Sequence, residues 1–397
     1  MLFGKELEGA LEIFPEYAED IREKSETERL IALSDIYRIY VPSQMGKEIY
    51  SKIYLSTVRS LKKKQTREAV QQYNENYKAM NGEDYSGIIG GSDSYSITGI
   101  SGTGKSTSIN RAISLMSSNQ IIEVKDPYQK IITCLVVQCP FDASVKGTLM
   151  EILRLVDVKL GTNYYKDALR SHATIDGLIG SVSNIAMTHI GTIIIDEIQH
   201  VVNNKGGKNL IFCLTQLINN SGVSICMVGT PECEDFFSQA MQMARRSIGL
   251  RYGELKYGEE FIDFCKAIWR YQYVKKQSVL NDAIIRWLYE HSNGNKSIVV
   301  CLIHDAQELA ILNGKEVLDL DSLSDAYKNR MSLLFDYIAP KRRKQTSSKK
   351  AAVLKLSENT FDDKAQSVTE IVEYAKNTGK EIVSCLKSVL TVEEVKV

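Results

Sequence analysis

Residues 94–113 read SYSITGISGTGKSTSINRAI, and this stretch decides the fold. A β-like run precedes a glycine-rich turn, and a helix-like run follows it. The turn, residues 99–106, matches the pattern G-x-x-x-x-G-K-[ST], in which backbone N–H groups face phosphate oxygens at the positive end of a helix. Because the strand and the helix are both expected, a chance glycine-rich turn is the weaker interpretation.

The pattern in this turn predicts a set of nucleotide-binding residues. Lys105 is expected to reach the β- and γ-phosphates of a nucleoside triphosphate, and the Ser106 hydroxyl is expected to bind Mg²⁺. The full expected set is Gly99, Ser101, Gly102, Thr103, Gly104, Lys105, Ser106 and Thr107.

The stretch GTIIIDEIQHV, residues 191–201, carries the second motif. Its apolar strand ends in Asp196, whose carboxylate is expected beside the phosphate loop, where it holds Mg²⁺ directly or through water. Glu197 is then placed to polarise a water for attack on the γ-phosphate. A surface Asp-Glu pair after a core strand is common by itself, but behind a phosphate loop the pair predicts nucleoside triphosphate hydrolysis.

Two weaker signals follow the second motif. Thr230 ends another apolar strand in CMVGTPE. Its hydroxyl is expected to bond the attacking water or the γ-phosphate, and a turn hydroxyl before Pro231 is the alternative. Arg245 and Arg246 follow a helical run, and Arg251 precedes the last strand. In a ring, such an arginine reaches the γ-phosphate of a neighbouring subunit, with Arg245 or Arg246 preferred; alone, an arginine pair is more often a solvated face.

Composition describes a globular protein with no global charge. The 397 residues are 44% hydrophobic and 25% charged, and 49 Lys plus Arg balance 49 Asp plus Glu, so any nucleic-acid surface must come from local clusters. The eight cysteines form no CxxC pair and suggest buried, reduced thiols rather than a metal site. No signal peptide and no membrane span are expected, and we expect a cytoplasmic protein.

The pattern of apolar residues divides the chain into four parts. Residues 1–90 predict a helical N-terminal extension, and residues 91–257 predict an α/β core in which apolar strands alternate with helices to form a parallel sheet. Residues 258–338 predict a helical lid. A basic linker and C-terminal tail, residues 339–397, complete the chain.

The order of phosphate loop, Asp-Glu strand, polar strand tip, arginines and helical lid resembles an AAA+ ATPase, a P-loop fold that binds ATP. Within that superfamily the chain resembles the transposition regulators of the TnsC/TniB kind. The likeness lies in YVPSQMGKEIYSKI (residues 40–53), in VVQCPFDASVKGTLMEILRLVDVKLG (136–161), and in the stretch from IIIDEIQHV to LTQLINNSGVSICMVGTPE (193–232).

This resemblance implies an ATP-bound homo-oligomer, a ring or filament around DNA, that links a target-selecting protein of the TniQ/TnsD kind to a transposase. In such families the segment after the second strand helps to line the DNA-facing pore. Lys146, with Ser144 and Thr148, is therefore a candidate contact to the DNA backbone that ignores sequence and depends on salt. A solvated lysine at a helix start explains Lys146 equally well.

The sequence departs from the family pattern at one place. AAA+ lids often carry a sensor arginine in a Gly-x-x-Arg pattern, whereas Gly294–Ser297 reads GNKS, with Lys296 as its only cation. The basic clusters at 61–67 and 341–350 are either solvated surface or docking sites for DNA or a partner protein. An AAA+ replication initiator or helicase loader, and an ATP-gated signalling scaffold, are the alternative functions.

Overall fold

The computed structural model describes residues 1–331, except 91–92, 117–120, 126–127, 141–143, 203–206, 235–236 and 239–248. These residues belong to one structural unit, Met1–Pro340; a second unit, Lys341–Val397, lies outside the described residues. None of the helices in the described part of the chain has the length and apolar character that a membrane crossing requires.

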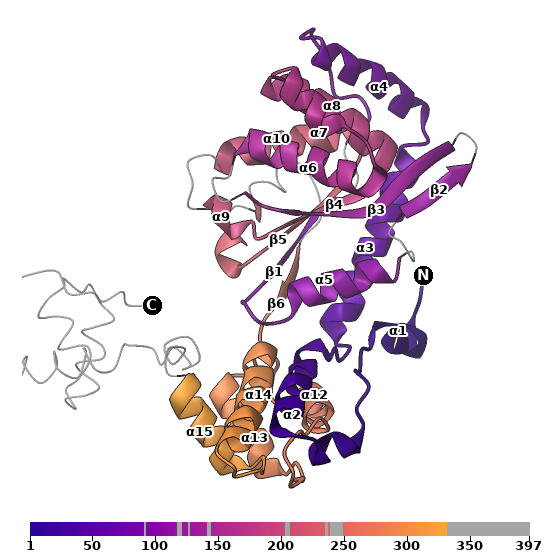
Figure 1. Ribbon diagram of the computed structural model, residues 1–397. Helices are drawn as coiled ribbons and strands as arrows, with labels where there is room; N and C mark the ends of the chain where they lie inside the picture. Colours follow the sequence, from indigo (N-terminus) through magenta and orange to yellow (C-terminus); the bar gives the residue numbers. More distant parts are fainter. Residues whose placement is uncertain are drawn as a thin grey trace, which may run out of the picture. The chain divides into compact units, whose positions relative to one another are not determined.

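A six-stranded sheet forms the centre of the α/β core, in the order β2-β3-β4-β5-β1-β6 (Figure 1). Five of the strands run parallel, as the sequence predicts, and β2 pairs with β3 in the antiparallel direction. The strands are β1 (Tyr95–Gly99), β2 (Ile121–Lys125), β3 (Tyr128–Gln138), β4 (Ile190–Asp196), β5 (Ser224–Gly229) and β6 (Leu250–Tyr252).

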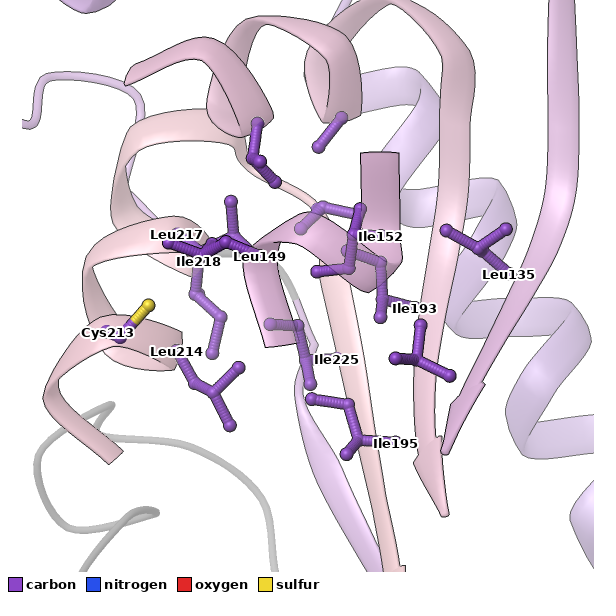
Figure 2. Packing of buried hydrophobic residues seen from close by; sticks show 14 of the residues in the cluster. Leu135, Leu149, Ile152, Ile193, Ile195, Cys213, Leu214, Leu217, Ile218 and Ile225 are labelled. Atoms are coloured by element: carbon purple, nitrogen blue, oxygen red, sulfur yellow. The ribbon is translucent and has the colours of Figure 1, made fainter. Parts of the chain in front are cut away.

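Helices cover both faces of this sheet, because the inner strands are apolar on both sides. Along β4, Ile193 and Ile195 enter the core on one face, while Ile194 enters the core on the other. Figure 2 shows the first of these two cores, where Ile152 of α6 and Leu217 of α10 pack over the strands. The helices of this layer are α6 (Val145–Leu160), α7 (Tyr164–Arg170), α8 (Ile175–His189) and α10 (Gly207–Ser221).

The opposite face is covered by α5 (Lys105–Ser114) and by α3 (Gln44–Lys63), which comes from the predicted N-terminal extension. The first helix, α1 (Gly4–Leu11), joins the same core through Leu7 and Leu11. Arg111 of α5 holds the end of α1 by donating to the Ala10 and Leu11 carbonyl oxygens, both at 2.7 Å. Another helix of the extension, α4 (Arg67–Met80), packs instead on α8.

The lid has its own core, which takes part of the N-terminal extension into it. Leu33 and Ile36 lie among the buried residues of the lid helices. The lid helices are α12 (Glu259–Trp269), α13 (Asp282–Ser292), α14 (Lys296–Leu312) and α15 (Leu320–Arg330); the N-terminal elements beside them are η1 (Glu19–Glu23), α2 (Glu26–Leu33) and η2 (Ser34–Arg38).

A buried ion pair joins these two parts of the chain. The Arg29 guanidinium on α2 is fully buried and donates to both carboxylate oxygens of Glu316, each at 2.7 Å, and to the Tyr273 carbonyl oxygen. The hydrogen bond from Arg29 holds the pKa of the Glu316 carboxyl below its usual value. Residues 1–90 therefore contribute to the sheet core, to the α8 layer and to the lid.

Candidate functional site

A cavity of about 330 Å³ opens at the carboxyl ends of the parallel strands β1, β4 and β5. This edge is where open α/β sheets bind ligands. The cavity wall contains the glycine-rich loop, Asp196, Glu197 and Thr230, which the sequence places in one site. It also contains residues of the N-terminal extension and of the lid.

The glycines of the loop occupy positions that other residues would distort. Gly102 and Gly104 have φ angles of +82° and +94°, in the left-handed region that favours glycine. A Cβ atom on Gly99 would lie 2.7 Å from the Tyr252 carbonyl oxygen. The Thr103 hydroxyl donates to the Ile100 carbonyl oxygen at 2.9 Å, a hydrogen bond within the turn. The loop leads directly into α5, so the N–H groups of the loop lie at the start of that helix.

The Lys105 amine is folded back on this loop. Its Nζ donates to the Gly99 carbonyl oxygen at 2.6 Å and to the Ile100 carbonyl oxygen at 2.9 Å. Burial lowers the pKa of the Lys105 amine, while the Asp196 and Glu197 carboxylates act in the opposite direction. A phosphate group at the loop would give this amine an anionic partner in place of two neutral carbonyl groups.

Ser106 and Asp196, the two expected Mg²⁺ ligands, are in direct contact. The Ser106 hydroxyl donates to Asp196 Oδ2 at 2.9 Å. Neighbouring oxygen ligands of an octahedral Mg²⁺ ion, each at about 2.1 Å from the metal, are separated by about 3 Å. A hydroxyl and a carboxylate at this separation are hard oxygen donors that fit such an ion.

Glu197 stands beside Asp196 in a left-handed backbone conformation, with φ at +58°. Its N–H donates to Asp196 Oδ1 at 2.9 Å, and its carboxylate accepts a hydrogen bond from the Gln199 side chain. Thr230 also lines the cavity, but its hydroxyl donates to Glu232 at 2.9 Å within the same turn. This is the turn contact that the sequence left open for Thr230, and a role for it on water remains a prediction.

The other predicted residues lie apart from this cavity or outside the described residues. Arg245 and Arg246 fall in the undescribed segment 239–248, so their proposed role in a neighbouring site stays a prediction. Arg251 is on β6, where its guanidinium forms an exposed ion pair with Glu234.

The three predicted DNA contacts at the start of α6 differ in exposure. Lys146 is exposed, and the Ser144 hydroxyl caps the helix by accepting from the Gly147 N–H at 3.1 Å. Thr148 is fully buried, with its hydroxyl on the Ser144 carbonyl oxygen at 3.0 Å. We therefore correct this expectation for Thr148: its side chain faces the protein interior because it lies on the packed side of α6.

In the basic cluster at residues 61–67, Lys64 forms hydrogen bonds to backbone carbonyl groups of the fold. The Lys64 amine donates to the Ala186 carbonyl oxygen at 2.7 Å and to the Ile190 carbonyl oxygen, at the end of α8. The Ala186 carbonyl oxygen also accepts the Ile190 N–H, so the Lys64 amine adds a second donor where α8 passes into β4. Lys62 and Arg67 in the same cluster are exposed.

Sequence reasoning missed the apolar residues of the cavity wall. Tyr37, Ile39 and Val41 come from the N-terminal extension, and Phe264 and Val300 come from the lid. These residues give the cavity wall apolar surface of the kind that suits a flat, apolar base. They are separated by more than 200 residues in sequence and carry no local motif, so only the folded chain brings them together.

Sequence reasoning also missed Asn295 and Gln199. Gln199 is the side-chain donor to Glu197 described above. The Asn295 side-chain amide donates to the Ser101 carbonyl oxygen at 2.9 Å, and the Ser297 N–H donates to the Gly102 carbonyl oxygen at 3.2 Å. The start of α14 therefore bonds directly to the phosphate loop. An Asn before a helix is a signal for an N-cap, but nothing in the sequence indicates the loop contact.

Solved structures similar to this chain include three DNA-associated proteins. The Aeropyrum pernix ORC1 protein in complex with DNA is 16% identical, with a TM-score of 0.44 over 83% of this chain and 78% of that one. Drosophila ORC bound to DNA is 10% identical, with a TM-score of 0.47 over 95% and 81%. The Thermotoga maritima RuvB Holliday junction branch migration motor is 12% identical, with a TM-score of 0.39 over 88% and 85%. At this level the likeness is distant.

A comparison with curated proteins gives no match. Residues 90–237 match a protein-family model described as an AAA domain. This range contains the glycine-rich loop, the Asp-Glu strand and Thr230. The match supports nucleotide binding and nucleotide hydrolysis in general terms, and it identifies this part of the chain as an AAA-type P-loop ATPase domain.

Proposed function

We propose that the protein hydrolyses ATP with Mg²⁺ and uses the nucleotide to regulate DNA transposition, by assembling on DNA and linking a target-selecting protein to a transposase. The observation that carries the ATPase part is the contact between Ser106 and Asp196, 2.9 Å apart at the wall of the cavity that also contains Lys105 and Glu197. The transposition part is supported by the sequence resemblance described above.

Different residues of the cavity are proposed to bind the phosphates, the base and the metal ion. The loop N–H groups and the Lys105 amine bind the phosphates, and the apolar surface of Tyr37, Ile39 and Phe264 takes the base. Ser106 and Asp196 would hold the metal ion, and a bound Mg²⁺ would supply positive charge that offsets the negative charge of the phosphates.

Glu197 is the general base of the proposed reaction. A water molecule attacks the γ-phosphorus, the bond from that phosphorus to the bridging oxygen of ADP breaks, and the water proton passes to the Glu197 carboxylate. Thr230, which lines the same cavity, is proposed to contact the water or the γ-phosphate after its hydroxyl leaves Glu232.

DNA binding is proposed at the start of α6, where Lys146 is exposed. Lys146 and Ser144 at the start of α6 contact backbone phosphates, which makes the contact independent of sequence and sensitive to salt. Arg245 or Arg246 completes the catalytic site of a neighbouring subunit in the ring or filament. The transposase and a TniQ/TnsD-like protein are the proposed partners.

The ATPase part is tested with the purified full chain and two variants. Lys105→Met is expected to weaken ATP binding at least about 30-fold, because it removes a charged partner of the phosphates. Glu197→Gln is expected to retain ATP and to stop its hydrolysis, and Lys328→Met on the exposed face of α15 is the control. Titration with a fluorescent ATP analogue and assays of phosphate release give the result. A parent chain that takes up no ATP would overturn the proposal.

Assembly is tested by electron microscopy of Glu197→Gln with ATP and duplex DNA. We expect rings or filaments on DNA at low salt, and monomers without retained DNA would contradict the regulatory role.

A second candidate function, that of an AAA+ replication initiator or helicase loader, fits an AAA domain equally well. Pull-down from the native host distinguishes the two: a transposase supports the first reading and a replicative helicase the second. A signalling scaffold predicts that Glu197→Gln changes neither assembly nor DNA retention.

A further inference from the structure

One face of α14 in the lid brings three metal-ligating side chains together. His304, Asp305 and Glu308 each offer a ligand atom, and these atoms all lie within 4.8 Å of one another. Residues 304 and 308 are about one helical turn apart and so share a face of the helix. All three side chains are half-buried. None of them lines the nucleotide cavity, so the cluster is separate from Ser106 and Asp196.

The His304 ring and the Asp305 carboxylate are already in contact. Nδ1 of His304 lies 3.0 Å from Asp305 Oδ1, although consecutive side chains on a helix point about 100° apart. A metal ion would take the place of the proton that these two atoms share. Donors held tetrahedrally at about 2.1 Å from Zn²⁺ are about 3.5 Å apart, so the three donors would need shifts of only about 1 Å.

Two further residues hold members of the cluster in place. Arg330 on α15 donates from Nη1 to Glu308 Oε2 at 2.5 Å, which leaves the other carboxylate oxygen, Oε1, to a metal ion. The Tyr37 ring of η2 packs against the His304 ring, with centroids 4.7 Å apart. Outer contacts of this kind orient the carboxylates and imidazoles that bind metal ions. Three elements of the fold therefore position the donors.

The charge of the cluster and its donor types select a class of ion. Asp305 and Glu308 bring two carboxylates close together, and Arg330 is the only permanent cation paired with them among the described residues. A divalent cation would offset the repulsion between the carboxylates. Mg²⁺ and Ca²⁺ prefer oxygen donors throughout, whereas an imidazole nitrogen suits Zn²⁺ and similar ions. One imidazole with two carboxylates therefore favours Zn²⁺ over Mg²⁺.

We propose that His304, Asp305 and Glu308 form a binding site for a divalent transition-metal ion of the Zn²⁺ class, separate from the proposed Mg²⁺ site at the phosphate loop. Three protein ligands leave the remaining coordination position to water. The ion would also fasten α14 to α15, because Glu308 would bind the metal with one oxygen and Arg330 with the other. Binding at this site needs no nucleotide, so it is independent of the proposed ATPase function.

The test measures Zn²⁺ binding by the purified full chain, freed of metal with EDTA and without nucleotide. Equilibrium dialysis with elemental analysis counts the bound ions, and competition with a chromogenic chelator gives the affinity. We expect one tightly bound Zn²⁺ per chain, which excess Mg²⁺ does not displace. His304→Asn removes the imidazole donor and should weaken binding at least about 10-fold. His291→Asn, at a half-buried position of α13, is the matched control and should bind Zn²⁺ as the parent does.

Two further variants test the carboxylates. Asp305→Asn and Glu308→Gln keep the shape of each side chain and should each weaken Zn²⁺ binding by a similar factor. Thermal melting checks that every variant is folded, and Zn²⁺ should raise the melting temperature of the parent and of His291→Asn but not that of His304→Asn.

Co²⁺ serves as a spectroscopic probe of the ligands, because its absorption distinguishes imidazole and carboxylate donors from cysteine thiolates. We expect the spectrum of nitrogen and oxygen donors, and a thiolate spectrum would overturn the site. A parent chain that binds no Zn²⁺, or a folded His304→Asn variant that binds it as tightly as the parent, would also overturn it. These outcomes leave the ATPase proposal unaffected, since no step of the experiment involves ATP.

Discussion

Asn295 of the lid donates its side-chain amide to the Ser101 carbonyl oxygen in the phosphate loop, at 2.9 Å. The Oδ1 atom of the same side chain accepts the N–H groups of Ser297 and Ile298 and so caps α14. A Cβ atom on Gly102 would lie 2.7 Å from that oxygen, so only glycine allows the close approach. The sequence has no arginine at this helix start, and the lid instead meets the loop through backbone carbonyl groups.

We expect Asn295→Asp to uncouple the lid from nucleotide binding. Aspartate keeps the helix cap, but it replaces the donor to Ser101 with a carboxylate oxygen. Loss of this hydrogen bond, worth about 0.5–1.5 kcal/mol, would weaken ATP binding by about 2- to 12-fold. Asn281→Asp is the matched control, because Asn281 caps α13 in the same way, through the Ile284 N–H. Equal ATP affinities in the two variants would show that the hydrogen bond from Asn295 to Ser101 does not contribute to ATP binding.

Ser106→Ala should affect only the binding of ATP that depends on Mg²⁺. The substitution removes the hydroxyl that contacts Asp196 and leaves the loop N–H groups and Lys105 in place. We expect the gain in ATP affinity on adding Mg²⁺ to fall by about 10-fold, the effect of about 1.4 kcal/mol, with no change in affinity in EDTA. Ser114→Ala, at the other end of α5, is the control. Equal Mg²⁺ dependence in Ser106→Ala and the parent would refute the metal role.

The sequence predicts the sheet well because its signals are local. Apolar runs followed by helical stripes place all five parallel strands, and the alternation of residues such as Ile193 and Ile194 matches the two cores. The missed strand is β2, which is only partly buried and pairs at the edge through a hairpin. An edge strand lacks the continuous apolar run that identified the inner strands.

In the candidate site, too, the sequence predicts the residues of local motifs and misses those that only tertiary packing brings together. Lys105 and Ser106 lie in one contiguous motif, and the strand order brings Asp196 to them, so the sequence predicts this constellation. Asn295 reaches the loop only because the lid folds over it, and Tyr37 joins the cavity through a segment that packs with the lid. Contacts of this kind depend on tertiary packing and leave no periodic pattern.

Lys146→Gln should weaken DNA binding equally for all sequences. An exposed lysine that neutralises one phosphate contributes about one unit to the slope of log K against log salt. We therefore expect that slope to become shallower by about one unit per subunit contact. Lys166→Gln is the control, because Lys166 is an exposed lysine on the neighbouring helix α7. Fluorescence anisotropy at several salt concentrations gives the slopes, and identical slopes for both variants would exclude Lys146 as a phosphate contact.

Arg29→Met should destabilise the lid strongly. The fully buried guanidinium is the bidentate partner of Glu316, and its removal leaves that carboxylate without its cation. Removing one partner of a buried pair costs about 3–5 kcal/mol. The double variant Arg29→Met with Glu316→Gln should cost less than the sum of the two single variants, because it leaves no unpaired charge. Urea unfolding followed by circular dichroism measures these differences, and additive costs would contradict the pairing.

The same pair predicts how stability depends on pH. The hydrogen bond from Arg29 lowers the pKa of Glu316, so the folded state binds the carboxylate proton less readily than the unfolded state does. Stability from this group is present above the unfolded pKa of about 4.3 and is lost as the pH falls through the lower folded pKa.

Glu316→Gln isolates this contribution from that of other carboxyl groups, because glutamine has the shape of protonated glutamate and does not titrate. We expect the parent to be more stable than this variant at pH 6, with a difference that shrinks steadily once the pH falls below about 4.3. Urea unfolding of both proteins between pH 6 and pH 3 measures the difference. A difference that stays constant over this range would mean that the Glu316 proton affinity is the same in the folded and unfolded chains, and the ion pair would then contribute nothing through charge.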